Sequence, residues 1–233
     1  KVISGYNDMI MARLFDHVHL LELAQHASVP VINGLTDYNH PCQIMADILT
    51  VLEHRKSLDD LKITYVGDGN NIVHSWLALA MRIPFNFTIA CPENYQPDMD
   101  LVQKARQECT AEIEVSHEPF EAVKNSDVIY TDVWVSMGEG KEKWAERIEL
   151  LKPYQVTAQV MAKTGNPRTK FMHCLPAFHN AETEVGAGIE EEFGITAMEV
   201  TEEVFESPAS IVFDQAENRL HTIKAILVAT LAN

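Results

Sequence analysis

Short apolar runs of strand length alternate along this chain with segments whose apolar residues recur every three or four positions. The apolar runs cover residues 9–12, 29–32, 63–66, 87–90, 112–115, 128–131, 170–172 and 210–213. The segments with helical spacing include residues 18–27, 43–54, 71–81, 100–109 and 216–231. Strands that alternate with helices predict an α/β protein in which crossover helices cover doubly wound parallel sheets.

Two breaks in this alternation indicate where the chain passes between domains. Residues 56–60 (KSLDD) and the segment at 206–210 (ESPAS) interrupt the pattern with polar and turn-forming residues. We therefore expect two doubly wound parallel-sheet domains. One comprises residues 1–54 together with a returning C-terminal helix within 206–233, and the other comprises residues 55–205.

Charge and cysteine content exclude several classes of function. The chain carries 34 acidic and 18 basic residues, which argues against a nucleic-acid partner because such a partner requires a basic face. The longest apolar stretch, at 225–232, is too short to span a membrane. The four cysteines include no CxxC pair, so neither a zinc knuckle nor a redox dithiol is indicated. Unpaired cysteines fit a reducing compartment, and we expect a cytoplasmic protein without a bound metal.

Polar and charged residues directly follow five of the predicted strands. They are Arg13 and the segments NGLTDYNHPCQ (33–43), GDGNN (67–71), DVWVSMG (132–138) and HCLP (173–176). Open α/β sheets bind ligands in the crevice outside the carboxyl ends of their strands. These residues therefore predict one shared ligand site, although they lie far apart in the sequence.

Two local patterns suggest other chemistries, and both are incomplete. Gly67 and Gly69 begin a dinucleotide fingerprint, but its third glycine falls on Ile72, which favours a plain strand-to-helix turn. Cys174 beside His173 suggests a thiol hydrolase. However, adjacent strand residues point to opposite faces, whereas a nucleophile and its base need hydrogen-bond contact. We therefore expect no nicotinamide, flavin or other cofactor.

Five blocks of the sequence resemble the ornithine carbamoyltransferases. They are NGLTDYNHPCQIMADILT (33–50), VGDGNNIVHS (66–75), YTDVWVSMGE (130–139), FMHCLPAFH (171–179) and VFDQAENRLHTIKA (212–225). The HPxQ pattern alone marks the wider superfamily that includes the aspartate enzyme, whereas DxxxSMG together with HCLP points to ornithine. The resemblance implies a carbamoyl phosphate domain, partly present here, and an ornithine domain. It also implies transfer of a carbamoyl group from carbamoyl phosphate to the δ-amine of L-ornithine, giving L-citrulline and phosphate.

The resemblance assigns one set of residues to carbamoyl phosphate. The set is Arg13, His40, Pro41, Cys42, Gln43, Cys174, Leu175 and Arg219. Within it, both arginines contact the substrate, His40 and Gln43 form a carbonyl-binding pair, and the Leu175 carbonyl faces the carbamoyl NH2 group. Such groups suit a phosphate and a carbonyl oxygen on which negative charge grows. Without the resemblance, Arg219 would be interpreted as a helix-surface charge and His40 as a helix cap or core residue.

The resemblance assigns a second set of residues to ornithine, namely Asn71, Asp132, Ser136 and Met137. The δ-ammonium group of ornithine has an unperturbed pKa of about 10.4, so it must lose a proton before it attacks. Asp132 contacts the substrate and Cys174 lies near the reacting amine; with His40 and Arg13 they form the implied catalytic group. Whether Asp132 or Cys174 accepts the proton or only orients the amine is left open. Free cysteine is also a common core residue, and Met137 also fits simple packing.

The family places a Ser-x-Arg-Thr-Arg phosphate loop well upstream of the HPxQ pattern, and this chain contains no such loop. We therefore expect the chain to be N-terminally incomplete, and weak in carbamoyl phosphate binding or inactive by itself. The family is trimeric, which implies a homotrimer or a multiple of trimers in which a neighbouring subunit helps to complete each site. The loop at 138–143 is expected to close over ornithine.

Other functions remain open on the sequence alone. A carbamoyltransferase for another amine, such as putrescine or an acylated ornithine, would share the donor residues, although the SMG segment matches a free α-amino acid head group. A non-catalytic relative would keep the ligand pocket without turnover. The sequence does not distinguish arginine synthesis from arginine breakdown, because both use the same reaction.

Overall fold

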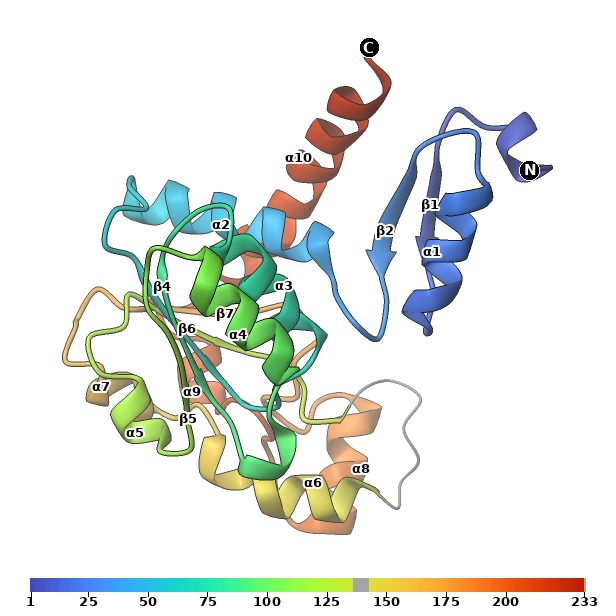
Figure 1. Ribbon diagram of the computed structural model, residues 1–233. Helices are drawn as coiled ribbons and strands as arrows, with labels where there is room; N and C mark the ends of the chain where they lie inside the picture. Colours follow the sequence, from blue (N-terminus) through green and yellow to red (C-terminus); the bar gives the residue numbers. More distant parts are fainter. Residues whose placement is uncertain (136–142, 233) are drawn as a thin grey trace.

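The computed structural model describes residues 1–135 and 143–232, which form two parallel sheets and the helices that cover them (Figure 1). The first sheet pairs β1 (Ile10–Arg13) with β2 (Val31–Leu35). The second has the strand order β5-β4-β3-β6-β7, and every adjacent pair of strands is parallel. The predicted α/β class with parallel sheets is confirmed.

The remaining elements follow the predicted alternation. The strands of the second sheet are β3 (Lys62–Val66), β4 (Asn86–Ala90), β5 (Ile113–Ser116), β6 (Val128–Thr131) and β7 (Lys170–His173). The α-helices are α1 (His17–His26), α2 (Pro41–Arg55), α3 (Asn71–Ala80), α4 (Met99–Glu108), α5 (Pro119–Ala122), α6 (Trp144–Leu151), α7 (Ala158–Lys163), α8 (Glu184–Phe193), α9 (Glu202–Phe205) and α10 (Val212–Leu231). Seven of the eight predicted strands overlap observed strands.

The predicted strand at 210–213 is wrong. Ser210 makes only an isolated bridge to Phe171. Two hydrogen bonds form this bridge: the Phe171 N–H donates to the Ala209 carbonyl, and the Ile211 N–H donates to the Phe171 carbonyl. α10 then begins at Val212, ahead of the predicted start at residue 216. A short apolar run has no readable period. Here Ile211 and Val212 are buried because they anchor the start of the helix to the core.

The second sheet is buried on both faces, which explains the near-continuous apolar character of its central strands. One face, which includes Tyr65 and Tyr130, packs against α2, α3 and α4. The opposite face, which includes Val66 and Ile129, packs against α5, α7 and α9. Neighbouring residues of one strand thus face opposite layers. The sheet therefore lies between two layers of helices.

The strand order creates a topological switch point between β3 and β6. From β3 the chain continues through β4 and β5 on one side, and then adds β6 and β7 on the other side. The connections that leave β3 and β6 therefore diverge, which is the arrangement that opens a ligand crevice in such sheets. The segments GDGNN and DVWVSMG follow these two strands.

The last helix, α10, packs against α2 (Figure 1). Asn218 Nδ2 donates to Thr50 Oγ1 at 2.9 Å and to Glu53 Oε2 at 2.7 Å, and His54 Nε2 lies 2.7 Å from Asp214 Oδ2. These contacts bring the C-terminal helix beside the helix that carries the HPxQ pattern. None of the described helices is both long and apolar enough to cross a membrane.

Candidate active site

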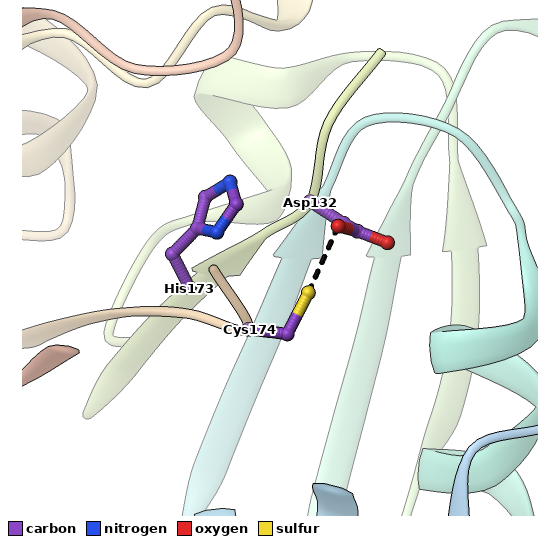
Figure 2. Close-up of side chains that lie close together, drawn as sticks. All are labelled: Asp132, His173 and Cys174. Carbon is purple, nitrogen blue, oxygen red and sulfur yellow. Dashed lines mark hydrogen bonds between the residues drawn. The ribbon is translucent and has the colours of Figure 1, made fainter. Parts of the chain in front are cut away.

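Asp132, directly after β6, is the centre of a hydrogen-bonded group at the switch point (Figure 2). Cys174, directly after β7, donates from Sγ to Asp132 Oδ1 at 2.8 Å. Asn70, in the turn after β3, donates from Nδ2 to Asp132 Oδ2 at 2.7 Å. The Val133 N–H donates to Asp132 Oδ1 at 2.8 Å. Three donors therefore hold the carboxylate in one orientation.

Cys174 is a neutral thiol in this setting. Burial raises the pKa of the thiol well above its usual range, and the charge of Asp132 and the hydrogen bond to it raise the pKa further. Thiolate is the reactive form of cysteine, so Cys174 acts here as a donor to Asp132 and not as a nucleophile. His173 has other partners: its Nδ1 accepts from the Leu175 N–H at 2.9 Å, and its Nε2 lies 3.2 Å from Glu199 Oε1. The geometry supports the rejection of a thiol hydrolase.

Asn70 contacts the site, although the sequence motifs did not single it out. Its Oδ1 caps α3 by accepting from the Ile72 N–H at 3.0 Å, which leaves Nδ2 for Asp132. Asn71, the residue that the resemblance assigns to ornithine, donates from Nδ2 to the Thr36 carbonyl at 2.8 Å and ties α3 to the segment after β2. Asparagine is a favoured helix cap, so the sequence signals a cap at Asn70. The sequence also places GDGNN and Asp132 at one shared site, but it does not indicate that Asn70 is the amide that contacts Asp132.

The two glycines of GDGNN have structural reasons of their own. Gly67 has φ of +142°, which residues with a side chain rarely adopt. A Cβ atom on Gly69 would lie 2.3 Å from the backbone nitrogen of Pro97. These glycines thus allow a tight turn after β3 and a close approach of the chain around Pro97, as the turn interpretation predicted.

A second group of polar side chains gathers around the start of α2. His40 directly precedes this helix, is buried, and donates from its backbone N–H to Ser75 Oγ at 2.7 Å. Burial, followed by the charges of Arg219 and Arg13, lowers the pKa of the His40 imidazole to about 4. His40 is therefore neutral near pH 7 and has two cations within electrostatic reach. Among the residues that the structure describes, His40 Nδ1 and Arg219 Nη1 are buried without a hydrogen-bond partner.

The other residues of the HPxQ pattern occupy the first turn of α2. Pro41 takes the first helical position, where proline is well tolerated. Cys42 Sγ donates to the Asn33 carbonyl at 3.3 Å. Burial raises the pKa of the Cys42 thiol, although the charge of Arg219 and a hydrogen bond with it act in the opposite direction. Cys42 thus lies next to the cationic group as a neutral thiol.

The structure therefore brings the predicted residues together in two groups. Asp132 and Cys174 are in direct contact, whereas Arg13, at the exposed end of β1, and Arg219 act electrostatically on His40. Leu175 directly follows Cys174 and has φ of +50°. Ser136, Met137 and most of the loop at 138–143 lie outside the described residues.

The chain matches the models of two domains of one protein family. The Asp/Orn binding domain of aspartate/ornithine carbamoyltransferase matches residues 59–230, and the carbamoyl-P binding domain of the same family matches residues 1–53. The chain belongs to the aspartate/ornithine carbamoyltransferase family.

Similar proteins of this family are named ornithine carbamoyltransferase. The chain is 53% identical to the chloroplastic ornithine carbamoyltransferase of Pisum sativum, over 99% of this chain and 56% of that protein. It is 52% identical to the catabolic enzyme of Pseudomonas putida, over 100% of this chain and 71% of that protein. The solved ornithine carbamoyltransferase of Pyrococcus furiosus matches with a TM-score of 0.88 at 42% identity, over 100% of this chain and 69% of that chain. The chain thus spans 56% to 71% of the length of these carbamoyltransferases.

Asp132, His173 and Cys174 also place potential metal-ligand atoms within 4.8 Å of one another. Each of the three side chains has a contact within the protein. Cys174 Sγ donates a hydrogen bond to Asp132, and His173 Nε2 lies 3.2 Å from Glu199 Oε1. A metal ion would have to displace these contacts. The absence of a metal stays a prediction from the sequence.

The depressed pKa of His40 predicts a pH-dependent contribution to stability. Because the folded-state pKa is about 4 and the unfolded value is 6.5, the folded state binds fewer protons between these values. Stability therefore falls as pH falls from about 7 to 4, by about 3 kcal/mol for this group. Urea unfolding of the wild type and of His40→Gln should show this as a difference in free energy that shrinks towards pH 4.

The difference between the two proteins is the right measurement, because other groups also titrate in this range. The pKa of the buried Asp47 is raised to about 7 by burial, and this opposes the effect of His40 in the wild type. The contribution of Asp47 is common to both proteins and cancels in the difference. Parallel pH curves for the wild type and His40→Gln would contradict the prediction.

Proposed function

We propose that the protein transfers the carbamoyl group of carbamoyl phosphate to the δ-amine of L-ornithine, giving L-citrulline and phosphate. The observation that carries this proposal is the pairing of Asp132 with Cys174 and Asn70 at the switch point, together with the cationic group around His40. One group suits an ammonium-bearing acceptor and the other an anionic donor. The names of the similar proteins point the same way.

The donor side is proposed to bind carbamoyl phosphate through charge and through unpaired donors. His40 Nδ1 and Arg219 Nη1 are buried without a hydrogen-bond partner, as are nine other polar atoms of the described residues. The charge of Arg219 acts on His40, so these two unpaired groups together suit an anionic ligand with a carbonyl oxygen. Arg219 and Arg13 supply positive charge for the phosphate. A neutral His40 keeps one N–H to donate to the carbonyl oxygen, where negative charge grows when the amine attacks.

The acceptor side is proposed to bind the side chain of ornithine through Asp132. Three donors orient its carboxylate, and the negative charge of the carboxylate attracts the δ-ammonium group. The amine must lose one proton before attack. The C–N bond then forms, the C–O bond to phosphate breaks, and the second proton leaves with the phosphate as HPO4²⁻. Asn71, Ser136 and Met137 are proposed for the α-amino acid head group, and the Leu175 carbonyl for the carbamoyl NH2.

The test is a measurement of carbamoyl transfer by the full-length protein with different acceptors. We expect citrulline from L-ornithine and carbamoyl phosphate, with kcat/KM for putrescine and Nα-acetylornithine at least about 100-fold lower, because the site would leave groups for the free head group unpaired. A comparable rate with putrescine and none with ornithine would reassign the acceptor. Ligand binding without turnover of any of these amines would favour the non-catalytic alternative.

The proposal extends to the assembly and the compartment. The likeness to the ornithine carbamoyltransferases, a family that the sequence analysis gives as trimeric, supports a homotrimer or a multiple of trimers. The free cysteines support the cytoplasm. A monomeric mass for the full-length protein in sedimentation equilibrium would contradict the trimer.

A further inference from the structure

Asp47 is a fully buried acid in α2 that the sequence motifs did not single out. It lies one helical turn after Gln43, on the same face of the helix. Gln43 Nε2 and Gln215 Nε2 each donate to Asp47 Oδ1 at 2.8 Å, and Tyr130 OH donates to Oδ2 at 2.8 Å. A buried carboxylate is costly unless it is fully hydrogen-bonded. Its donors come from α2, α10 and β6, so three elements converge on one charged group.

The carboxylate of Asp47 determines which end of the Gln43 amide is available to a ligand. An ionised carboxylate only accepts hydrogen bonds, so it holds the NH2 end of Gln43 and leaves the carbonyl oxygen at the other end. A free carbonyl oxygen suits the NH2 of a carbamoyl group and does not suit its carbonyl oxygen. The orientation thus argues against the expected carbonyl-binding role for Gln43, and leaves that role to His40.

The same reasoning applies to Gln215 on the other side of Asp47. Gln215 Nε2 donates to Asp47 Oδ1 and, at 3.2 Å, to Tyr130 OH. This orientation turns Gln215 Oε1 towards β7, where it accepts from the His173 N–H at 3.0 Å. Cys174, the partner of Asp132, is the next residue. The Asp47 carboxylate therefore orients two amides. One belongs to Gln43 at the start of α2, and the other belongs to Gln215, which accepts from the His173 N–H.

We infer that Asp47 is a positioning residue of this active site, which orients the Gln43 amide towards the carbamoyl group and, through Gln215, holds the turn that carries Cys174. The inference rests on the proposed function, because it takes carbamoyl phosphate as the ligand of Gln43. The raised pKa of Asp47 is consistent with its burial, and the three donors and the charge of Arg219 act in the opposite direction. The three donated hydrogen bonds all use lone pairs on the Asp47 oxygens, which the ionised carboxylate supplies.

The test is Asp47→Asn in the full-length protein, which keeps the shape of the side chain but replaces one acceptor oxygen by a donor. It cannot satisfy Gln43, Gln215 and Tyr130 together, so the Gln43 amide is free to turn. We expect KM for carbamoyl phosphate to rise about 10- to 100-fold, because a turned Gln43 amide leaves the buried carbamoyl NH2 group without this acceptor. The matched control is Thr50→Val, which removes the Asn218–Thr50 hydrogen bond between the same two helices. It should lower the melting temperature and leave KM unchanged.

A second variant covers the case in which Asp47→Asn does not fold. Gln215→Met keeps the length of the side chain and leaves the Asp47–Gln43 contact in place. We expect kcat to fall about tenfold, because the His173 N–H loses its acceptor, and KM for carbamoyl phosphate to stay within about threefold. Unchanged kinetics in this variant would overturn the inference.

The outcomes separate the inference from the proposed function. If the wild type forms citrulline and Asp47→Asn loses only stability, with KM and kcat unchanged, Asp47 is structural and the inference fails. If the wild type forms no citrulline from ornithine, the proposed function fails instead. A rise in KM for carbamoyl phosphate in Asp47→Asn, with no rise in Thr50→Val, supports the inference.

Discussion

Asp132→Asn is expected to lower kcat/KM for L-ornithine by about 100- to 1,000-fold, in the range found for loss of a positioned acid–base group. The substitution removes the negative charge that attracts the δ-ammonium group. It also disturbs the local geometry, because Asp132 accepts from Asn70, Cys174 and the Val133 N–H. An amide at this position has one acceptor oxygen, so its NH2 group meets another donor. Steady-state kinetics with varied ornithine measures the effect.

The specificity of this loss is the decisive part of the measurement. The Kd for carbamoyl phosphate should stay within about threefold of the wild type, since Arg13, His40 and Arg219 form a separate group. Cys174→Ser keeps a donor towards Asp132 and should lose about tenfold or less. Equal loss of carbamoyl phosphate binding and ornithine turnover in Asp132→Asn would show that the two roles are misassigned.

The convergence of Asp132 and Cys174 follows from physical rules that the sequence displays. Each residue follows an apolar run of strand length, and β6 and β7 are parallel neighbours whose carboxyl ends share one edge of the sheet. Residues after such strands meet whatever their separation in sequence. The sequence alone therefore predicted that the polar residues after these strands meet, although it did not give the strand order.

Other contacts could not be predicted from the sequence, because they depend on which atom of a side chain faces which neighbour. Asn70 and Asn71 are adjacent amides in one turn, yet one contacts Asp132 and the other the Thr36 carbonyl. Asp47 reads as an ordinary polar position of a helix, and its donors Gln215 and Tyr130 lie 168 and 83 residues away. The false strand at 210–213 has a similar cause, since burial makes the start of a helix as apolar as a strand.

Arg219→Met is expected to raise KM for carbamoyl phosphate by about 10- to 100-fold while the unliganded protein becomes no less stable. Arg219 Nη1 is buried without a partner among the described residues, and its charge already opposes protonation of His40. An unpaired buried donor costs free energy in the absence of an anion. Methionine retains the length and the apolar stem, so we expect a gain on the order of 1 kcal/mol in the free energy of unfolding.

These opposite signs for stability and binding distinguish a ligand-binding arginine from a structural one. Urea unfolding without ligand and kinetics with varied carbamoyl phosphate measure the two effects on the same protein. Arg82→Met replaces an exposed arginine after α3. It should change KM for carbamoyl phosphate by no more than about threefold and the free energy of unfolding by no more than about 0.5 kcal/mol. A less stable Arg219→Met protein with an unchanged KM would mean that Arg219 supports the α2–α10 packing and does not bind the phosphate. The paired result is expected because Arg219 Nη1 is buried without a partner until an anion binds.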